Sequence, residues 1–171
     1  MPLALSVAAA TVLAVLVVAA GEAALSAHNA AVLIARGAVE PADDVYPVMQ
    51  WAYPLGFVAM GVEGALTGPA PPTVLASGLA LFGAAKALKA WSISSLGPRW
   101  TFRVLVPPGA PLVTHGPYRL MRHPNYLAVV GEIAGVALTV WAPITGAAAL
   151  VGFGWLLWQR MAVEDRALGR R

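Results

Sequence analysis

The sequence contains no cysteine, and this absence excludes several kinds of site at once. Disulfide frameworks, thiolate metal centres and cysteine nucleophiles all depend on that side chain. The absence says nothing about redox compartment, because reducing and oxidising environments both tolerate a cysteine-free chain. Internal repeats and a second composition-defined domain are also missing, so we expect one domain over residues 1–171.

Charged residues are scarce too. They make up 11% of the chain and hydrophobic residues 59%, whereas about a quarter of a soluble domain is charged. About 20 apolar residues in a helix cross the roughly 30 Å hydrocarbon core of a bilayer. The sequence therefore predicts an all-α integral membrane protein with five transmembrane helices, at about residues 3–26, 45–66, 73–94, 125–141 and 143–160.

The first apolar run also resembles a signal peptide, because Ala19-Ala-Gly21 has the small side chains of a cleavage site. No lysine or arginine precedes this run, and the run is longer than the apolar core of a signal peptide. These two features favour a first membrane span. We expect its helix to continue past the bilayer, through the polar residues Ser26, His28 and Asn29.

The net charge of +3 raises the question of a nucleic-acid partner. With five spans and the N-terminus outside, all eleven lysines and arginines fall at or near the inner face. The positive-inside rule explains this distribution without nucleic acid. We expect no nucleic-acid partner, and a C-terminus in the cytosol.

A long segment from Pro98 to Pro124 contains six prolines and no helical periodicity. Loops longer than about 12 to 15 residues are usually functional or disordered, and the aromatic residues of this segment favour function.

The last two helices are joined by little more than Trp141-Ala-Pro143, which predicts a tight helical hairpin. Its two helices could approach closely at the glycines Gly131, Gly135, Gly146, Gly152 and Gly154. We therefore divide the domain into residues 1–97 and a cytosolic loop with hairpin over 98–171.

The hairpin is expected to bring Arg122-His-Pro-Asn-Tyr126 beside Arg160 and Glu164, which lie one helical turn apart. Alone, the second pair would be interpreted as a surface ion pair. Together with the preceding Gly116-Pro-Tyr118, the pattern resembles the isoprenylcysteine carboxyl methyltransferase family and the related membrane phospholipid methyltransferases. The resemblance covers roughly residues 100–168.

The resemblance implies an S-adenosylmethionine-dependent methyltransferase with Arg160 facing the substrate. Arg103 stands where the family often has an amide, so it is left out of the predicted site. Aromatic and prolyl faces suit adenine, and a carboxylate suits the ribose hydroxyls or the ammonium group. No strand followed by Gly-x-Gly-x-x-Gly is present, which argues against the soluble Rossmann solution. The implied cofactor-binding residues are Leu112, Val113, Tyr118, His123, Pro124, Asn125, Tyr126 and Glu164.

The first half resembles more narrowly the bacterial branch that methylates alkylresorcinols and alkylpyrones, through His28-Asn29, Arg36–Glu40, Tyr46-Pro47 and Leu96–Trp100. This implies a bacterial cytoplasmic membrane and methyl transfer to an oxygen of a lipophilic acceptor from the bilayer, in contact with His28, Asn29 and Arg160. Carboxyl methylation of isoprenylcysteine, N-methylation of a phospholipid and a non-catalytic membrane protein are the alternatives. The oligomeric state stays open.

Several ionisable residues are candidates for catalysis. Arg160 or Arg122 could stabilise a phenolate, and Glu132 or His28 could act as a base. Glu132 near mid-bilayer costs on the order of 2.5 to 3.5 kcal/mol and needs a partner, for which Arg160 is the simplest candidate, in a structural or an active-site pair.

The remaining polar residues have simpler interpretations. A lone histidine such as His28 is more often interfacial than catalytic. Glu22 on the first helix is expected to be structural, and Glu63 to be solvated. The spacing of His28, His115 and His123 shows no metal-ligand pattern, so we expect no metal.

Overall fold

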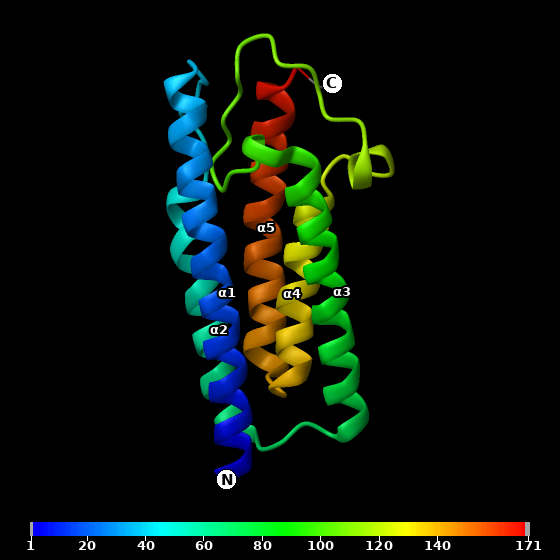
Figure 1. Cartoon of the computed structure of the whole chain (residues 1–171). Helices are drawn as coiled ribbons and strands as arrows, with labels where there is room; N and C mark the ends of the chain where they lie inside the picture. Colours follow the sequence, from blue (N-terminus) through cyan, green and yellow to red (C-terminus); the bar gives the residue numbers. More distant parts are fainter. Residues whose placement is uncertain (1, 170–171) are drawn as a thin grey trace.

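The computed structural model of the chain describes residues 2–169, and these residues are organised around five α-helices (Figure 1). Within this range there is no β-strand, only an isolated bridge between Val39 and Val106. The all-helical prediction is confirmed. Two stretches of the described chain, Val7–Ala35 and Pro72–Arg99, are long and apolar enough to cross a membrane by length and composition, and five membrane spans stay a prediction. The helices are α1 (Pro2–Ala35), α2 (Tyr46–Thr67), α3 (Pro72–Leu96), α4 (Pro124–Thr139) and α5 (Pro143–Ala167), with 3₁₀ turns η1 (Gly97–Arg99) and η2 (Gly116–Arg119).

The sequence explains where the helices begin and end. Proline occupies the first turn of α2, α3, α4 and α5, where its missing N–H is not needed. Helix α1 runs through Ser26 and His28 to Ala35 and ends before Gly37, which has a φ of 81°. Its 34 residues extend over about 50 Å, so the helix is longer than a bilayer core, as expected.

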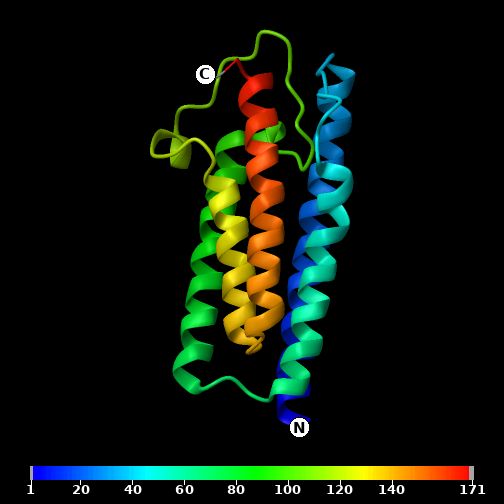
Figure 2. The same ribbon diagram turned by 180° about the vertical axis from the view of Figure 1, so that it is seen from behind.

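Polar connections gather at one end of the bundle. In Figure 1, α1 and α2 lie together, and α3, α4 and α5 form a second group. The α2–α3 connection and the tight α4–α5 turn lie near the N-terminal end, whereas the C-terminal end of α5 and the long loop lie at the opposite end. Figure 2 shows the loop arching across this second end between α3 and α4. We refer to it as the loop end.

Glycines of α4 allow its close contact with α3. The sequence instead predicts that these glycines pack α4 against α5 within the hairpin. A Cβ atom on Gly135 would lie 2.7 Å from the backbone nitrogen of Phe82, and one on Gly131 would lie 2.9 Å from the Cβ of Ala85. Only Gly146 packs within the hairpin, against Ala137 of α4. The prediction was wrong for Gly131 and Gly135, which face α3, and for Gly152 and Gly154, which have no neighbour within 4 Å at that position.

Glu63 is not simply solvated, and this corrects a second expectation. Its carboxylate accepts hydrogen bonds from the backbone nitrogens of Ile144 (3.0 Å) and Thr145 (2.7 Å). These nitrogens belong to the first turn of α5, where the chain leaves the hairpin turn and the helix dipole favours negative charge. Glu63 therefore ties α2 to the start of α5.

Candidate active site

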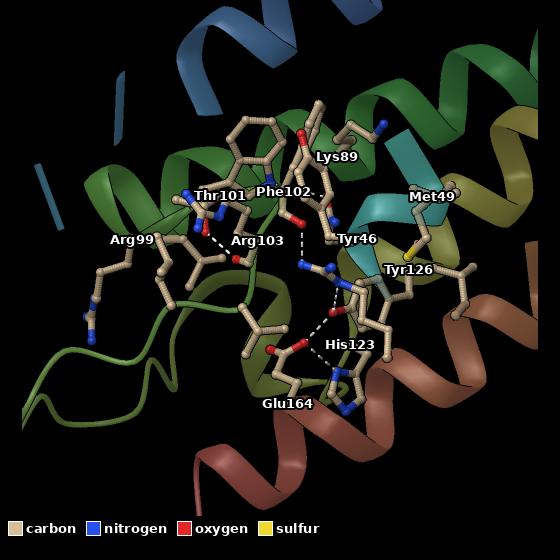
Figure 3. A pocket seen from close by; sticks show the side chains of 18 of the residues that line it. Tyr46, Met49, Lys89, Arg99, Thr101, Phe102, Arg103, His123, Tyr126 and Glu164 are labelled. Carbon is tan, nitrogen blue, oxygen red and sulfur yellow. Dashed lines mark hydrogen bonds and ion pairs between the residues drawn. The ribbon is translucent and has the colours of Figure 1, made fainter. Parts of the chain in front are cut away.

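A cavity of about 530 Å³ opens at the loop end and extends between the helices (Figure 3). Its volume lies in the range of small-molecule and cofactor sites. The loop over residues 99–113 covers one side, whereas small and apolar residues of four helices line the deeper part. These deeper residues are Leu16, Ala19, Ala20 and Ala23 of α1, Met49 and Pro54 of α2, Val129 of α4, and Phe153 and Leu157 of α5.

Most of the residues predicted to hold the cofactor lie around this cavity. Arg122 and Arg160 line it as well. Pro124 does not line it, because this residue is buried at the start of α4. The lining residues from the predicted set are Leu112, Val113, Tyr118, His123, Asn125, Tyr126 and Glu164. Their roles stay predictions, but the fold brings the loop and hairpin residues to one place.

Tyr126 and Glu164 form the corner where α4 and α5 meet the loop. The Tyr126 hydroxyl donates to the Glu164 carboxylate and accepts a hydrogen bond of 3.0 Å from Nε of Arg160. The His123 ring stacks on the Tyr126 ring, with centroids 5.3 Å apart and planes 13° apart. Stacking and hydrogen bonds together restrain both aromatic rings, and they leave the Glu164 side chain 27% exposed.

His123 lies between two carboxylates. Its Nδ1 is 3.7 Å from Glu164 and its Nε2 is 3.2 Å from Asp165. Burial alone would lower the pKa of His123, but the hydrogen bonds and charges of Glu164 and Asp165 outweigh it and raise that pKa above its usual value of 6.5. This end of the cavity therefore favours a positively charged imidazole.

Arg160 is buried and fully engaged. Its Nη1 lies 2.9 Å from Asp44, and its Nη2 donates to the carbonyl of Phe102. Asp44 in turn accepts hydrogen bonds from the backbone nitrogens of Tyr46 (3.1 Å) and Val104 (2.9 Å). One carboxylate thus connects the start of α2, the loop and α5. Sequence reasoning missed Asp44, whose only signal was its place two residues before Tyr46-Pro47.

Glu132 has partners other than the expected Arg160. Its Oε2 accepts hydrogen bonds from Lys89 Nζ (2.7 Å) and from the Tyr53 hydroxyl, and its Oε1 lies 3.1 Å from Lys86 Nζ. Both lysines also bind Glu22, at 2.8 Å and 3.1 Å. Glu132 pairs with these lysines because it lies on the side of α4 that packs against α3. Glu132 does not line the cavity, whereas Lys89 and Tyr53 do.

The two residues predicted to contact substrate on α1 lie outside the cavity lining. Asn29 is buried, and its side-chain nitrogen donates to the carbonyl of Trp100 at 2.8 Å. His28 is exposed. Ser26, one turn earlier, accepts a hydrogen bond of 2.7 Å from the backbone nitrogen of Phe102. The C-terminal end of α1 therefore holds the loop in place.

Further contacts fasten the loop on both sides. Arg103 lines the cavity and forms a two-point ion pair with Glu40, and the Val39–Val106 bridge continues this connection. On the other side, Nε1 of Trp100 donates to the Asn125 side chain at 3.2 Å. Within residues 2–169, no three His, Asp or Glu side chains gather in a way that could hold a metal ion.

The chain is similar in sequence to known proteins. The model of the isoprenylcysteine carboxyl methyltransferase (ICMT) family matches residues 78–170, more than half of the chain. The uncharacterized protein YpbQ of Bacillus subtilis (strain 168) is 32% identical over 149 residues, which cover 87% of this chain and 89% of YpbQ. No solved structure matches the chain significantly.

Proposed function

The chain belongs to the isoprenylcysteine carboxyl methyltransferase family, a family of membrane methyltransferases, and from this membership we propose that it uses S-adenosylmethionine to methylate an oxygen of a membrane-embedded, lipid-like acceptor. The acceptor we favour is a phenolic or pyrone polyketide lipid. The observation that carries the proposal is the cavity, which is lined by loop and hairpin residues at one end and by apolar helix residues at the other. Polar cofactor and apolar acceptor would meet between them.

The residues at the loop end fit the cofactor chemically. The aromatic face of Tyr118 and the apolar side chains of Leu112 and Val113 suit a flat adenine ring. The partly exposed Glu164 carboxylate can accept hydrogen bonds from ribose hydroxyls or from the ammonium group of the methionine part. When bound, S-adenosylmethionine supplies an electrophilic methyl group on a cationic sulfur.

The protein contributes alignment. Holding two reactants in line can supply several kcal/mol of a reaction barrier, provided that the residues around them are rigid. Arg160 meets this requirement, because Tyr126, Asp44 and Phe102 hold its guanidinium group from three sides. With its charge paired with Asp44, Arg160 positions the wall of the cavity, and the exposed Arg122 is a further cationic group in the cavity lining.

The apolar wall of the cavity supports a lipid-like acceptor, but it does not distinguish between acceptors with different head groups. Alanines at positions 19, 20 and 23 of α1 leave room for a chain beside Met49 and Phe153. A phenol or pyrone, a prenylated cysteine carboxylate and a phospholipid amine all carry such a chain. The resemblance of the first half of the sequence to the alkylresorcinol and alkylpyrone branch favours the first class.

A labelling experiment tests the proposal. Membranes that contain the protein are incubated with methyl-labelled S-adenosylmethionine and, separately, with an alkylresorcinol, an alkylpyrone, a quinol, a prenylcysteine and a phosphatidylethanolamine. We expect label in the alkylresorcinol or alkylpyrone. Tyr126→Ala should reduce labelling at least tenfold, while Arg166→Ala, which removes an exposed ion pair near the C-terminal end of α5, should not. Label in prenylcysteine or phospholipid alone would show that the acceptor is not a phenol or pyrone. The absence of label in every acceptor would contradict the proposed methyltransferase activity.

A further inference from the structure

Two lysines and two glutamates form a charge-balanced cluster inside the helix bundle. Lys86 and Lys89 of α3 each lie within 3.1 Å of Glu22 on α1 and of Glu132 on α4. Glu132 is fully buried and Lys89 is 2% exposed. Buried ion pairs of this kind contribute little net stability compared with apolar residues of the same volume. The cluster therefore invites a functional explanation.

Tyr53 connects this cluster to the cavity. The ring of Tyr53 lies edge-on against Phe57, with centroids 4.7 Å apart, and its hydroxyl donates to Glu132 Oε2. Tyr53 and Lys89 both line the cavity, whereas Glu132 does not. Figure 3 shows Lys89 at one edge of the cavity and Glu164 with His123 at the opposite edge. Tyr53 thus connects Glu132, which does not line the cavity, with the cavity lining, beside Lys89.

The direction of the hydrogen bond determines what Tyr53 can do. A phenol has one hydrogen to donate and lone pairs to accept. Because the hydrogen of Tyr53 is directed at Glu132, its oxygen meets any cavity ligand as an acceptor. An acceptor hydroxyl is the matching group, since it has a hydrogen to donate.

We propose that Tyr53 is a catalytic residue that takes the proton of the acceptor hydroxyl and passes its own proton to Glu132. The inference rests on the proposed function and extends it, because it assigns the acceptor-binding end of the cavity and limits acceptors to those with a hydroxyl proton to lose. In the step, the oxygen–hydrogen bond of the acceptor breaks as its oxygen–methyl bond forms. The methyl–sulfur bond breaks and leaves its electron pair on sulfur.

Charge balance supports this arrangement. The cluster is neutral before the step and carries one positive charge after Glu132 is protonated, while the sulfonium loses one positive charge in the same step. The total charge in the low-dielectric interior therefore stays constant. A weak base suffices, because the acceptor oxygen becomes strongly acidic as the new bond to carbon forms.

Tyr53→Phe tests the relay, because it keeps the ring and removes the hydroxyl. With a phenol acceptor at pH 7, we expect turnover to fall about 100-fold, within the usual range for general acid–base catalysis. Between pH 7 and 9 the variant should recover about tenfold per pH unit, following the ionised fraction of a phenol with a pKa of about 10. The parent protein should change little over the same range. Equilibrium binding of S-adenosylmethionine should be equal in both proteins.

Acceptors of graded acidity make the test sharper. A nitrophenol with the same alkyl chain is already ionised at pH 8, so Tyr53→Phe should methylate it nearly as fast as the parent. Tyr46→Phe is the matched control, since Tyr46 lines the same cavity without a bond to Glu132, and it should keep the parent's dependence on acceptor acidity. Equal dependence on pH and acidity in Tyr53→Phe and the parent would overturn the relay.

A second variant covers the case in which Tyr53→Phe does not accumulate in membranes. Glu132→Gln combined with Lys86→Met removes the final proton acceptor and keeps the cluster neutral. The turnover of this double variant should depend on pH and on the acidity of the acceptor in the same way as expected for Tyr53→Phe. A dependence like that of the parent would overturn the relay. The proposed function fails separately: in that case the parent itself methylates no acceptor and binds no cofactor.

Discussion

The Asp44 carboxylate lies 2.9 Å from Nη1 of Arg160, although 116 positions separate the two residues in the chain. Both side chains are buried, at 4% and 5% exposure. The same carboxylate accepts hydrogen bonds from the start of α2 and from the loop. Asp44 therefore connects the two groups of helices with the loop that covers one side of the cavity.

Replacing Asp44 should be costly for this reason. Asp44→Asn leaves the Arg160 charge buried without its partner, and breaking a buried pair in this way costs about 3 to 5 kcal/mol. The melting temperature of the protein in detergent should fall clearly. Asp43→Asn is the control: its ion pair with Arg166 is exposed and contributes less than about 1 kcal/mol. Equal melting temperatures for the two variants would show that Asp44 has no such role.

The close contact between α3 and α4 leads to a prediction about stability. Gly135→Ala should destabilise the protein by about 1 to 3 kcal/mol, because the new methyl group would meet the backbone of Phe82, which cannot move aside cheaply. Gly154→Ala on α5 should be neutral or slightly stabilising, since no atom lies within 4 Å and alanine favours helix. Thermal unfolding in one detergent checks both variants. A tolerated Gly135→Ala would contradict the packing.

Stability should also depend on the protonation of His123. Since Glu164 and Asp165 raise its pKa in the folded state against the effect of burial, the stabilisation is complete below about pH 6.5 and is lost as the pH rises through the folded-state pKa. The melting temperature of the parent should therefore fall from pH 6.5 towards alkaline pH. His123→Gln should reduce this fall, and His115→Gln, at an exposed loop position, should not. Identical pH profiles for all three proteins would refute the assignment.

The hairpin half of the site could be predicted from the sequence for a physical reason. A connection as short as Trp141–Pro143 forces α4 and α5 to be antiparallel, so Tyr126 and Glu164 must lie at the same end. The structure confirms this proximity, because the Tyr126 hydroxyl donates to Glu164. Prolines and glycines likewise marked the helix ends.

The pairings of Arg160 and Glu132 could not be predicted in the same way. They depend on how each helix is rotated and on which helix it packs against. Helices that are apolar on all sides carry no amphipathic signal of their orientation. Glu132 was therefore assigned to Arg160 on the neighbouring helix, whereas it faces Lys86 and Lys89 on α3.

Equilibrium binding of S-adenosylmethionine to the purified protein tests the central claim most directly. We predict saturable binding by the parent and by Arg166→Ala. Glu164→Gln should bind at least tenfold more weakly, a loss of about 1.4 kcal/mol, because the cavity would lose its partly exposed carboxylate. The absence of saturable binding by the parent, or equal affinity in Glu164→Gln, would contradict the account.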